Sequence, residues 1–346
     1  MMPETRQTEI LDFIKRHANC SSGDIHKEFA TSISYATVKR VVSQLLSEKL
    51  IISEGKGKGT RYFISPACEL LYPVDLENYY KKEIDERIIK EDFNFKIFEL
   101  LDKTAVLSEA EIQKLNSLQK QYTENIAQLS VNEYKKELER LAIDLSWKSS
   151  QIEGNTYSLL ETERLLKDRE TAAGKTKEEA IMLLNHKDAL DFIVENPDFM
   201  TPLTISGLES IHSLLMKELA VERNLRIRRV GISGTNYRPL DNEFQIREAV
   251  ESTCNLVNNK ENVFEKALLI LVLISYIQPF MDGNKRTARI VSNALLMNYK
   301  HCPLSFRTVD PIDYKKAMLL FYEQNNISGF KSIFINQFEF AVKTYF

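Results

Sequence analysis

Glycine, proline and cysteine are all scarce in this chain. Its 346 residues include eleven Gly, nine Pro and four Cys. Because turn-rich β architectures use many Gly and Pro residues, this scarcity favours a mainly helical fold. The four cysteines lie far apart and form no Cys-x-x-Cys pair, which excludes a zinc ribbon and a dithiol redox motif. We expect them to be buried free thiols in a reducing compartment.

Long apolar runs are also missing. The most hydrophobic stretch covers residues 267–277 and ends at Gln278-Pro279, whereas a membrane span needs about 20 apolar residues. The N-terminal residues contain no apolar run of the kind that signal peptides have. We therefore expect a cytoplasmic protein without membrane contact, in which residues 267–277 form a central core helix.

The charge of the chain is small but unevenly distributed. A net charge of −3 excludes a chain that binds polyanions over its whole surface. Residues 1–66 hold ten Lys and Arg against seven Asp and Glu, so this segment is +3 and the remainder is −6. A small basic module is therefore compatible with the composition. At roughly 150 residues per domain, the length suggests two or three domains.

Residues 1–66 have the pattern of a winged helix-turn-helix. Three short segments with apolar residues at helical spacing are followed by two β-rich runs, which flank the turn at residues 55–59. The third helix would contact DNA bases, and the wing would contact phosphates. The candidate DNA-binding residues are Tyr35, Thr37, Lys39, Arg40, Lys56, Lys58 and Arg61. Because +3 is a modest charge, contact with a protein is the alternative, and a homodimer would place two modules on a palindromic site.

A charged connector, expected to be helical, covers residues 67–107, and an almost entirely helical region covers residues 108–346. Residues 226–241 are the exception, because their pattern predicts a short β-hairpin. We expect His186 and His212 to be structural. The basic run beside the hairpin should lie on a solvated strand edge, and it comprises Arg223, Arg226, Arg228 and Arg229. The expected helices are 108–127, 131–150, 159–170, 176–195, 204–220, 243–258, 262–277, 284–299, 311–325 and 330–344.

The segment from Gln278 to Arg289 carries the residues best suited to chemistry. Pro279 ends one helix, and Gly283 permits a tight turn before the next. Backbone N–H groups at a helix start bind anions, and Asp282 is a hard oxygen ligand suited to Mg²⁺. Basic side chains add positive charge at Lys285, Arg286 and Arg289. These residues indicate a site for Mg²⁺ and a polyphosphate, with a solvated helix start capped by an Asp as the alternative.

The same segment resembles the signature of the Fic family, His-Pro-Phe-x-Asp/Glu-Gly-Asn-Gly-Arg-x-x-Arg. The chain matches it at Pro279, Phe280, Asp282, Gly283, Asn284, Arg286 and Arg289. Residues 149–155 resemble the inhibitory helix motif of that family, Ser/Thr-x-x-x-Glu-Gly/Asn, and residues 234–237 lie where such proteins carry a flap that holds the target. The resemblance covers roughly residues 95–345. It implies a mainly α fold, in which a helical Fic-type core with a β-hairpin flap follows the winged helix-turn-helix.

The resemblance also implies a function: transfer of AMP from ATP to a hydroxyl of a target protein. By position, Asp282 would bind Mg²⁺, and Glu153, with Ser149 and Gly154, would be inhibitory. Arg289 would contact the γ-phosphate or, in the inhibited state, pair with Glu153. Tyr314 and Tyr322 would line the adenine pocket unless they are core residues. The remaining implied sites are the nucleotide-binding residues Gly283, Asn284, Lys285 and Arg286 and the flap residues Gly234, Thr235, Asn236 and Tyr237.

Two positions differ from the family signature. Gln278 replaces the His that acts as general base, and loss of a general base typically costs about 10²–10⁴ in rate. Lys285 replaces Gly, as it does in the death-on-curing branch of phosphotransferases. Three functions therefore stay open: an autoinhibited AMP transferase, an inactive ATP-sensing transcriptional regulator, and a protein phosphotransferase.

Overall fold

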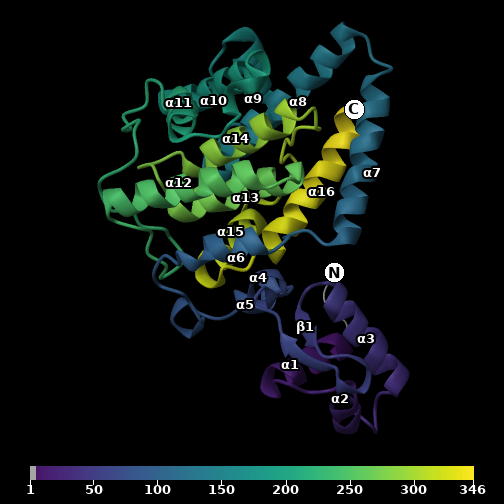
Figure 1. Ribbon diagram of the computed structural model, residues 1–346. Coiled ribbons are helices and arrows are strands. Elements are labelled where there is room, and N and C mark those ends of the chain that lie inside the picture. Colours follow the sequence, from purple (N-terminus) through teal and green to yellow (C-terminus); the bar gives the residue numbers. More distant parts are fainter. Residues whose placement is uncertain (1–4) are drawn as a thin grey trace.

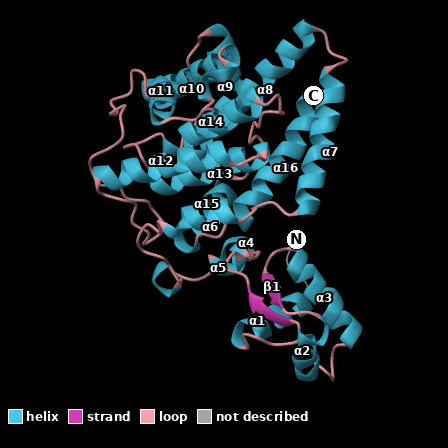
Figure 2. Ribbon diagram, viewed as in Figure 1, coloured by secondary structure: helices cyan, strands magenta, loops and turns pink. Residues whose placement is uncertain are grey.

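The computed structural model describes residues 5–346 and consists of a small N-terminal body and a large helical body (Figure 1). Helices dominate both bodies, and the two strands of the described chain form a single antiparallel sheet in the small body (Figure 2). The predicted mainly α class is therefore confirmed. No helix in the described part of the chain is long and apolar enough to cross a membrane.

The N-terminal body is a winged helix-turn-helix, as predicted. It contains helices α1 (Thr5–Arg16), α2 (Ser22–Glu28) and α3 (Tyr35–Ser47), strands β1 (Ile51–Glu54) and β2 (Arg61–Ile64), and a 3-10 turn, η1 (Gly57–Gly59), at the tip of the wing. Ser21 and Ser34 cap α2 and α3 by accepting backbone N–H bonds. The pairing of Ile51 with Ile64 closes the sheet over a core to which each of the three helices contributes.

The connector is less helical than predicted. It contains only the short turns α4 (Cys68–Leu71), α5 (Leu76–Tyr79) and η2 (Ile84–Glu86) before α6 (Lys96–Lys103). Outside these turns, backbone groups of the connector bond to the large body. The N–H of Lys90 donates to the carbonyl of Glu323 at 2.7 Å, and Leu70 accepts from the N–H of Ile327 at 2.8 Å. These long-range bonds replace those of a continuous helix.

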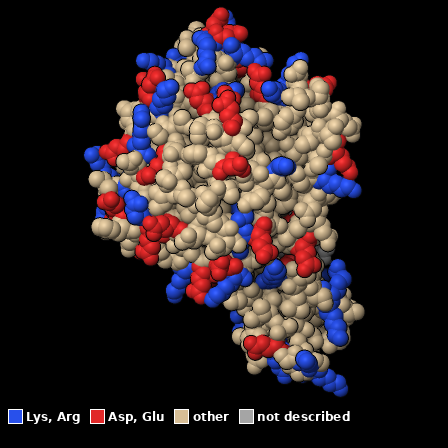
Figure 3. All heavy atoms as spheres, turned by 45° about the horizontal axis from the view of Figure 1, so that its top comes forward, with Lys and Arg blue, Asp and Glu red and all other residues tan. Residues whose placement is uncertain are grey.

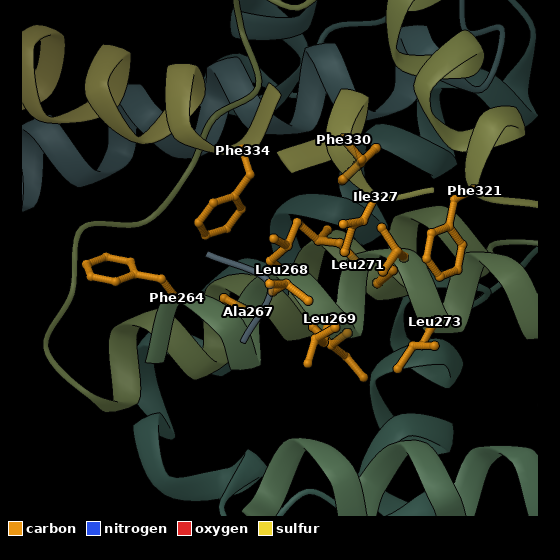
Figure 4. Close-up of a cluster of buried hydrophobic side chains, with 14 of the residues drawn as sticks. Phe264, Ala267, Leu268, Leu269, Leu271, Leu273, Phe321, Ile327, Phe330 and Phe334 are labelled. Carbon is orange, nitrogen blue, oxygen red and sulfur yellow. The ribbon is translucent and has the colours of Figure 1, made fainter. Parts of the chain in front are cut away.

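The large body is built around helix α13 (Val263–Ile277), which is buried from Phe264 to its last residue. A helix that is apolar on every side must be covered on every side, and α12, α14, α15 and α16 pack around α13. Figure 4 shows its leucines meeting phenylalanines from the C-terminal helices. This finding confirms the predicted central core helix. All four cysteines are free and buried, also as predicted.

The remaining helices follow the sequence pattern closely. Most begin at a Ser, Thr, Asn or Asp whose side chain accepts a backbone N–H bond of the first turn. Their bounds are α7 (Glu109–Ile126), α8 (Val131–Ile152), α9 (Leu159–Asp168), α10 (Lys177–Glu195), η3 (Pro197–Met200), α11 (Ile205–Leu215), α12 (Glu243–Asn259), α14 (Asn284–Asn298), α15 (Pro311–Gln324) and α16 (Ser328–Tyr345).

The β-hairpin predicted for residues 226–241 is wrong. This segment, here called the docking loop, contains no strand, and its one bridge pairs Arg238 with Asp92 of the connector. The expectation of four solvated arginines is also wrong at Arg226, which is fully buried. Its guanidinium donates to the carbonyls of Gln278, Arg228 and Leu240 at 2.5–2.7 Å. This buried arginine holds the two ends of the loop to the core in place of a strand ladder.

Candidate functional site

The candidate site is the turn between α13 and α14. Gln278 ends α13 in the left-handed conformation with φ 51°, and Gly283 precedes α14 with φ 78°. This positive φ favours glycine, and a Cβ at Gly283 would also require the terminal methyl of Met216, 2.5 Å away, to shift. The turn therefore brings the chain sharply onto the first turn of α14, where backbone N–H groups lack partners within the helix.

Asn284 holds this turn together from inside. Its Nδ2 donates to the side-chain oxygen of Gln278 at 3.0 Å and to the carbonyl of Phe280 at 2.9 Å, while its Oδ1 accepts from the Phe280 N–H at 2.8 Å. The amide nitrogen of Gln278 donates to the carbonyl of Ser275 at 2.6 Å. Both ends of the Gln278 side chain are thus engaged, and the amide has no basic nitrogen to accept a proton.

Arg286 provides buried donors beside the turn. One nitrogen of its guanidinium, Nη2, bonds to the carboxylate of Asp282 at 2.9 Å. The side chain is 1% exposed, and its Nε and Nη1 have no hydrogen-bond partner in the described chain. The neighbouring Thr287 hydroxyl is also buried, with no partner among the residues that the structure describes. Buried donors without partners are costly, so this cluster suits an anion with several oxygen atoms.

Glu153 neutralises two cations of α14. It caps the C-terminus of α8 and contacts Nη2 of Arg289 at 2.7 Å, the pair that the resemblance implied, and Nζ of Lys285 at 3.2 Å. Burial acts to raise the pKa of Glu153, but the charges of Arg289 and Lys285 outweigh it and hold the pKa at about 2. The carboxylate is therefore ionised at every physiological pH.

Ser149 completes the contact between α8 and α14. Its hydroxyl and its carbonyl accept from Arg289 at 2.8 and 3.0 Å, and the guanidinium lies 5.2 Å from the centre of the Tyr314 ring. Gly154 follows with φ 97°, a conformation that favours glycine and lets the chain leave α8 directly after Glu153. The residues predicted as inhibitory thus meet α14 at a buried arginine.

Asp282 is the carboxylate of the turn itself. Its side chain is 63% exposed, and no group of three or more His, Cys, Asp or Glu residues in the described chain is placed to hold a metal. Magnesium typically takes one or two carboxylates and completes its shell with water and substrate phosphates. The donor set therefore fits a Mg²⁺ ion that arrives with a nucleotide, and does not fit a resident metal held by the protein alone.

The structure buries both tyrosines that were proposed for the adenine pocket. Tyr314 and Tyr322 are each 1% exposed. Tyr314 packs on Phe330, while Tyr322 lies near the rings of Tyr237 and Tyr276. These contacts match the alternative reading of core residues, and an adenine-binding role stays a prediction.

The residues of the predicted flap are divided between core and surface. Tyr237 is buried and donates its hydroxyl to the carbonyl of Tyr276 at 2.9 Å, whereas Gly234 and Asn236 are exposed and Thr235 is half-buried. Tyr237 therefore fixes the loop to the core, and the turn of the loop lies at the surface.

The candidate DNA-binding residues lie on α3 and the wing. Tyr35, Lys39, Arg40, Lys56 and Lys58 are exposed, and Thr37 and Arg61 are half-buried. Tyr35 is fixed by a bond to the Ser22 hydroxyl at 3.0 Å and by the Lys39 ammonium 5.3 Å from its ring centre. Figure 3 shows basic side chains along one edge of this body. The placement is compatible with DNA contact, which stays a prediction.

His212 is a residue of the site that sequence reasoning treated only as structural. Its ring stacks on Phe280 with 3.8 Å between centroids, and its two nitrogens face the carbonyls of Arg223 and Asp282 at 3.0 and 2.9 Å. Burial lowers its pKa. His212 thus connects the turn to the chain just before the docking loop. Nothing in the sequence beyond an amphipathic helix indicated these contacts.

Comparison with known proteins agrees with this geometry. Residues 202–296 match the family model described as Fic/DOC family, and residues 5–121 match the model described as Penicillinase repressor. The chain is 28% identical over 177 residues to a protein adenylyltransferase Fic of Nematostella vectensis, which is 48% of this chain and 40% of the relative. It is 27% identical over 162 residues to one of Aedes aegypti, which is 44% of this chain and 32% of the relative.

A solved structure of a Fic family protein from Desulfovibrio desulfuricans has the same fold. It aligns with a TM-score of 0.59 at 18% identity and covers 69% of this chain and 74% of the other. The chain spans less than half the length of the two adenylyltransferases that it matches. Fold, turn and family match together define a Fic domain. Residues 202–296 therefore form a Fic-type domain, and the N-terminal body is a winged helix-turn-helix module.

Proposed function

We propose that this protein binds ATP with Mg²⁺ at the first turn of α14 and transfers AMP slowly to a protein hydroxyl. The observation that carries the proposal is the buried guanidinium of Arg286 beside a helix start, two of whose nitrogens have no hydrogen-bond partner among residues 5–346. Bound phosphate oxygens would satisfy these donors. The similarity to protein adenylyltransferases supports AMP as the transferred group.

In this proposal the residues of α14 act by binding and orienting the nucleotide. Arg286 would hold phosphate oxygens, and Arg289 would hold the γ-phosphate once Glu153 has left it. Asp282 would hold the Mg²⁺, which supplies positive charge against the phosphates. A bond would then form between the target oxygen and the α-phosphorus while the bond from that phosphorus to pyrophosphate breaks.

The proton of the attacking hydroxyl limits the rate. Gln278 cannot accept it, because an amide has no basic site near neutral pH, and its side chain is already engaged by Asn284 and Ser275. The proton would therefore pass to solvent. We expect transfer to be about 10²–10⁴ slower than with a histidine at this position.

Glu153 would hold the protein in an inhibited state. It occupies Arg289 and Lys285 together, so a triphosphate must displace it to reach either cation. A family member with glycine in place of Lys285 would lack the second of these contacts. We therefore propose that inhibition in this chain is stronger than one ion pair would give.

A second candidate is a regulator that binds ATP without chemistry and responds through DNA. It is favoured by two observations together: the engaged amide of Gln278 and the winged helix-turn-helix that residues 5–64 form. In this reading the domains are those expected from the sequence, residues 1–66, 67–107 and 108–346. A cytoplasmic homodimer would present two α3 helices to one operator.

Incubation with ATP labelled at the α- or the γ-phosphate, with and without Mg²⁺, distinguishes these functions. The proposal predicts α-label on protein, almost none in the wild type and a weak signal in Glu153→Gly. Label from the γ-phosphate would instead support a phosphotransferase, for which Lys285 is the one sequence indication. Binding without transfer of either label would support the regulator.

A further inference from the structure

The connector makes a set of contacts that the proposed function does not use. Arg87 lies in it, directly after η2 and about 140 residues before the docking loop in sequence. Its guanidinium donates through Nη1 to Glu323 of α15 at 2.9 Å and through Nη2 to the carbonyl of Gly234 at 3.0 Å. One planar group therefore bridges the connector, the end of α15 and the turn of the docking loop.

The contact of Arg87 with α15 is a buried ion pair. The side chains of Arg87 and Glu323 are 4% and 0% exposed. The other carboxylate oxygen of Glu323 accepts from the Tyr79 hydroxyl at 2.6 Å, and the ring of Tyr80 lies 5.1 Å from the Arg87 guanidinium. Further hydrogen bonds to the remaining donors and acceptors stabilise a charge pair this deeply buried. The Tyr79 hydroxyl serves that purpose for Glu323, and the Gly234 carbonyl does so for Nη2 of Arg87, whereas Nε of Arg87 has no hydrogen-bond partner in the described chain.

The docking loop depends on the connector beyond Gly234. The N–H of Arg238 donates to the carbonyl of Glu91 at 2.7 Å, and its guanidinium contacts the carboxylates of Glu91 and Asp92, each at 3.1 Å. Gly234 has φ 92°, and a Cβ there would lie 3.5 Å from the side chain of Leu319 on α15. The turn of the loop therefore rests on α15 and is held from its other side by the connector.

From these contacts we propose that Arg87 is a positioning residue for the docking loop, so that the connector is part of the site that receives a target protein. The assignment rests on the proposed function, since a docking loop presupposes a target. Arginine is required because its two terminal nitrogens reach Glu323 and Gly234 at once. A lysine has a single ammonium on a flexible side chain and cannot make both contacts in this fixed geometry.

The test is amide hydrogen exchange of the full chain, read at the Arg238 amide, together with thermal unfolding. In Arg87→Lys the ammonium can still neutralise Glu323, so the melting temperature should stay near that of the wild type. The loop contact is lost, and exchange at Arg238 should rise roughly tenfold, the effect of one charged hydrogen bond. If Arg87 only stabilised the fold, a variant with the wild-type melting temperature would also show wild-type exchange at the Arg238 amide.

A paired variant protects the test against misfolding. Arg87→Met together with Glu323→Gln removes both charges, and the new amide oxygen can still accept from Tyr79. Replacing both partners of a buried pair is often close to neutral for stability. This variant should also speed exchange at Arg238.

The matched control is Arg307→Met together with Asp144→Asn. In that pair Arg307 lies 3.1 Å from Asp144, which also accepts from a tyrosine hydroxyl, that of Tyr345. The control should leave exchange at Arg238 unchanged.

The outcomes are separable from those of the proposed function, because exchange needs neither ATP nor a target. Wild-type exchange at Arg238 in a folded Arg87→Lys protein would overturn the assignment, as would a rise in the Arg307 control. Faster exchange at Arg238 in both Arg87 variants, with unchanged exchange in the Arg307 control, supports the assignment. If ATP does not bind at α14, the proposed function fails while this measurement still decides the role of Arg87.

Discussion

Replacing Glu153 with glycine should convert a closed nucleotide site into an open one. The substitution removes the carboxylate that contacts Arg289 and Lys285 and leaves the Ser149 contacts of Arg289 in place. Glu153 has a pKa of about 2 against an ordinary 4.5, which means that its surroundings favour the carboxylate by about 3 kcal/mol. ATP must displace this carboxylate before its γ-phosphate reaches the same guanidinium. The apparent affinity for ATP should therefore rise about a hundredfold in the variant.

Isothermal calorimetry with Mg²⁺ and ATP measures this change. The matched control is Glu170→Gly, which removes an exposed glutamate from its ion pair with Arg164 just beyond α9. It should bind ATP as the wild type does. The unliganded Glu153→Gly protein should also be less stable, because Arg289 is fully buried and loses its counter-charge. A change in affinity of less than about threefold would refute the reasoning, since the carboxylate would then not compete with the nucleotide.

Three further predictions follow from the same geometry. In the Glu153→Gly background, Arg286→Ala should weaken ATP binding at least tenfold by calorimetry, roughly the effect of charged hydrogen bonds; unchanged affinity would place the phosphates elsewhere. The stabilisation that Glu153 provides, measured as the difference in unfolding free energy between wild type and Glu153→Gly, should be constant above about pH 5. It should fall as the pH drops from about 4.5 towards 2, because in that range the unfolded state takes up a proton at Glu153 while the folded state still holds the carboxylate ionised. The full chain should bind duplex DNA with a slope of log K against log salt of about −3 or steeper, because several lysines of α3 and the wing would each neutralise a phosphate. No binding at low salt would assign the module to protein contacts.

The helical framework and the turn were predictable because they depend on local signals. Residues 263–277 are apolar on every side, Pro279 follows the end of this helix, and Gly283 precedes the start of the next. The pairing of Glu153 with Arg289 followed from the resemblance of two separate motifs to one family. Each of these signals lies within a few residues, or within one recognised pattern.

The docking loop was predicted wrongly because its structure is decided by distant residues. Its alternating β-rich sequence suggested a hairpin, but Arg226 turns inward to the carbonyl of Gln278, and Arg238 pairs with the connector. Local propensity cannot reveal such partners. The contact of Lys285 with Glu153 escaped prediction for the same reason, since the two residues are 132 positions apart.

The most direct test of the account is mass spectrometry of the double variant Glu153→Gly with Gln278→His after incubation with Mg²⁺ and ATP. The first change removes the carboxylate from Arg289, and the second supplies a base whose pKa lies near neutral pH. The account predicts an AMP adduct on the double variant, a weak adduct on Glu153→Gly, and almost none on the wild type. Strong labelling of the wild type would contradict it, because Gln278 would then be no barrier to transfer. A folded double variant that binds ATP but remains unlabelled would contradict AMP transfer itself.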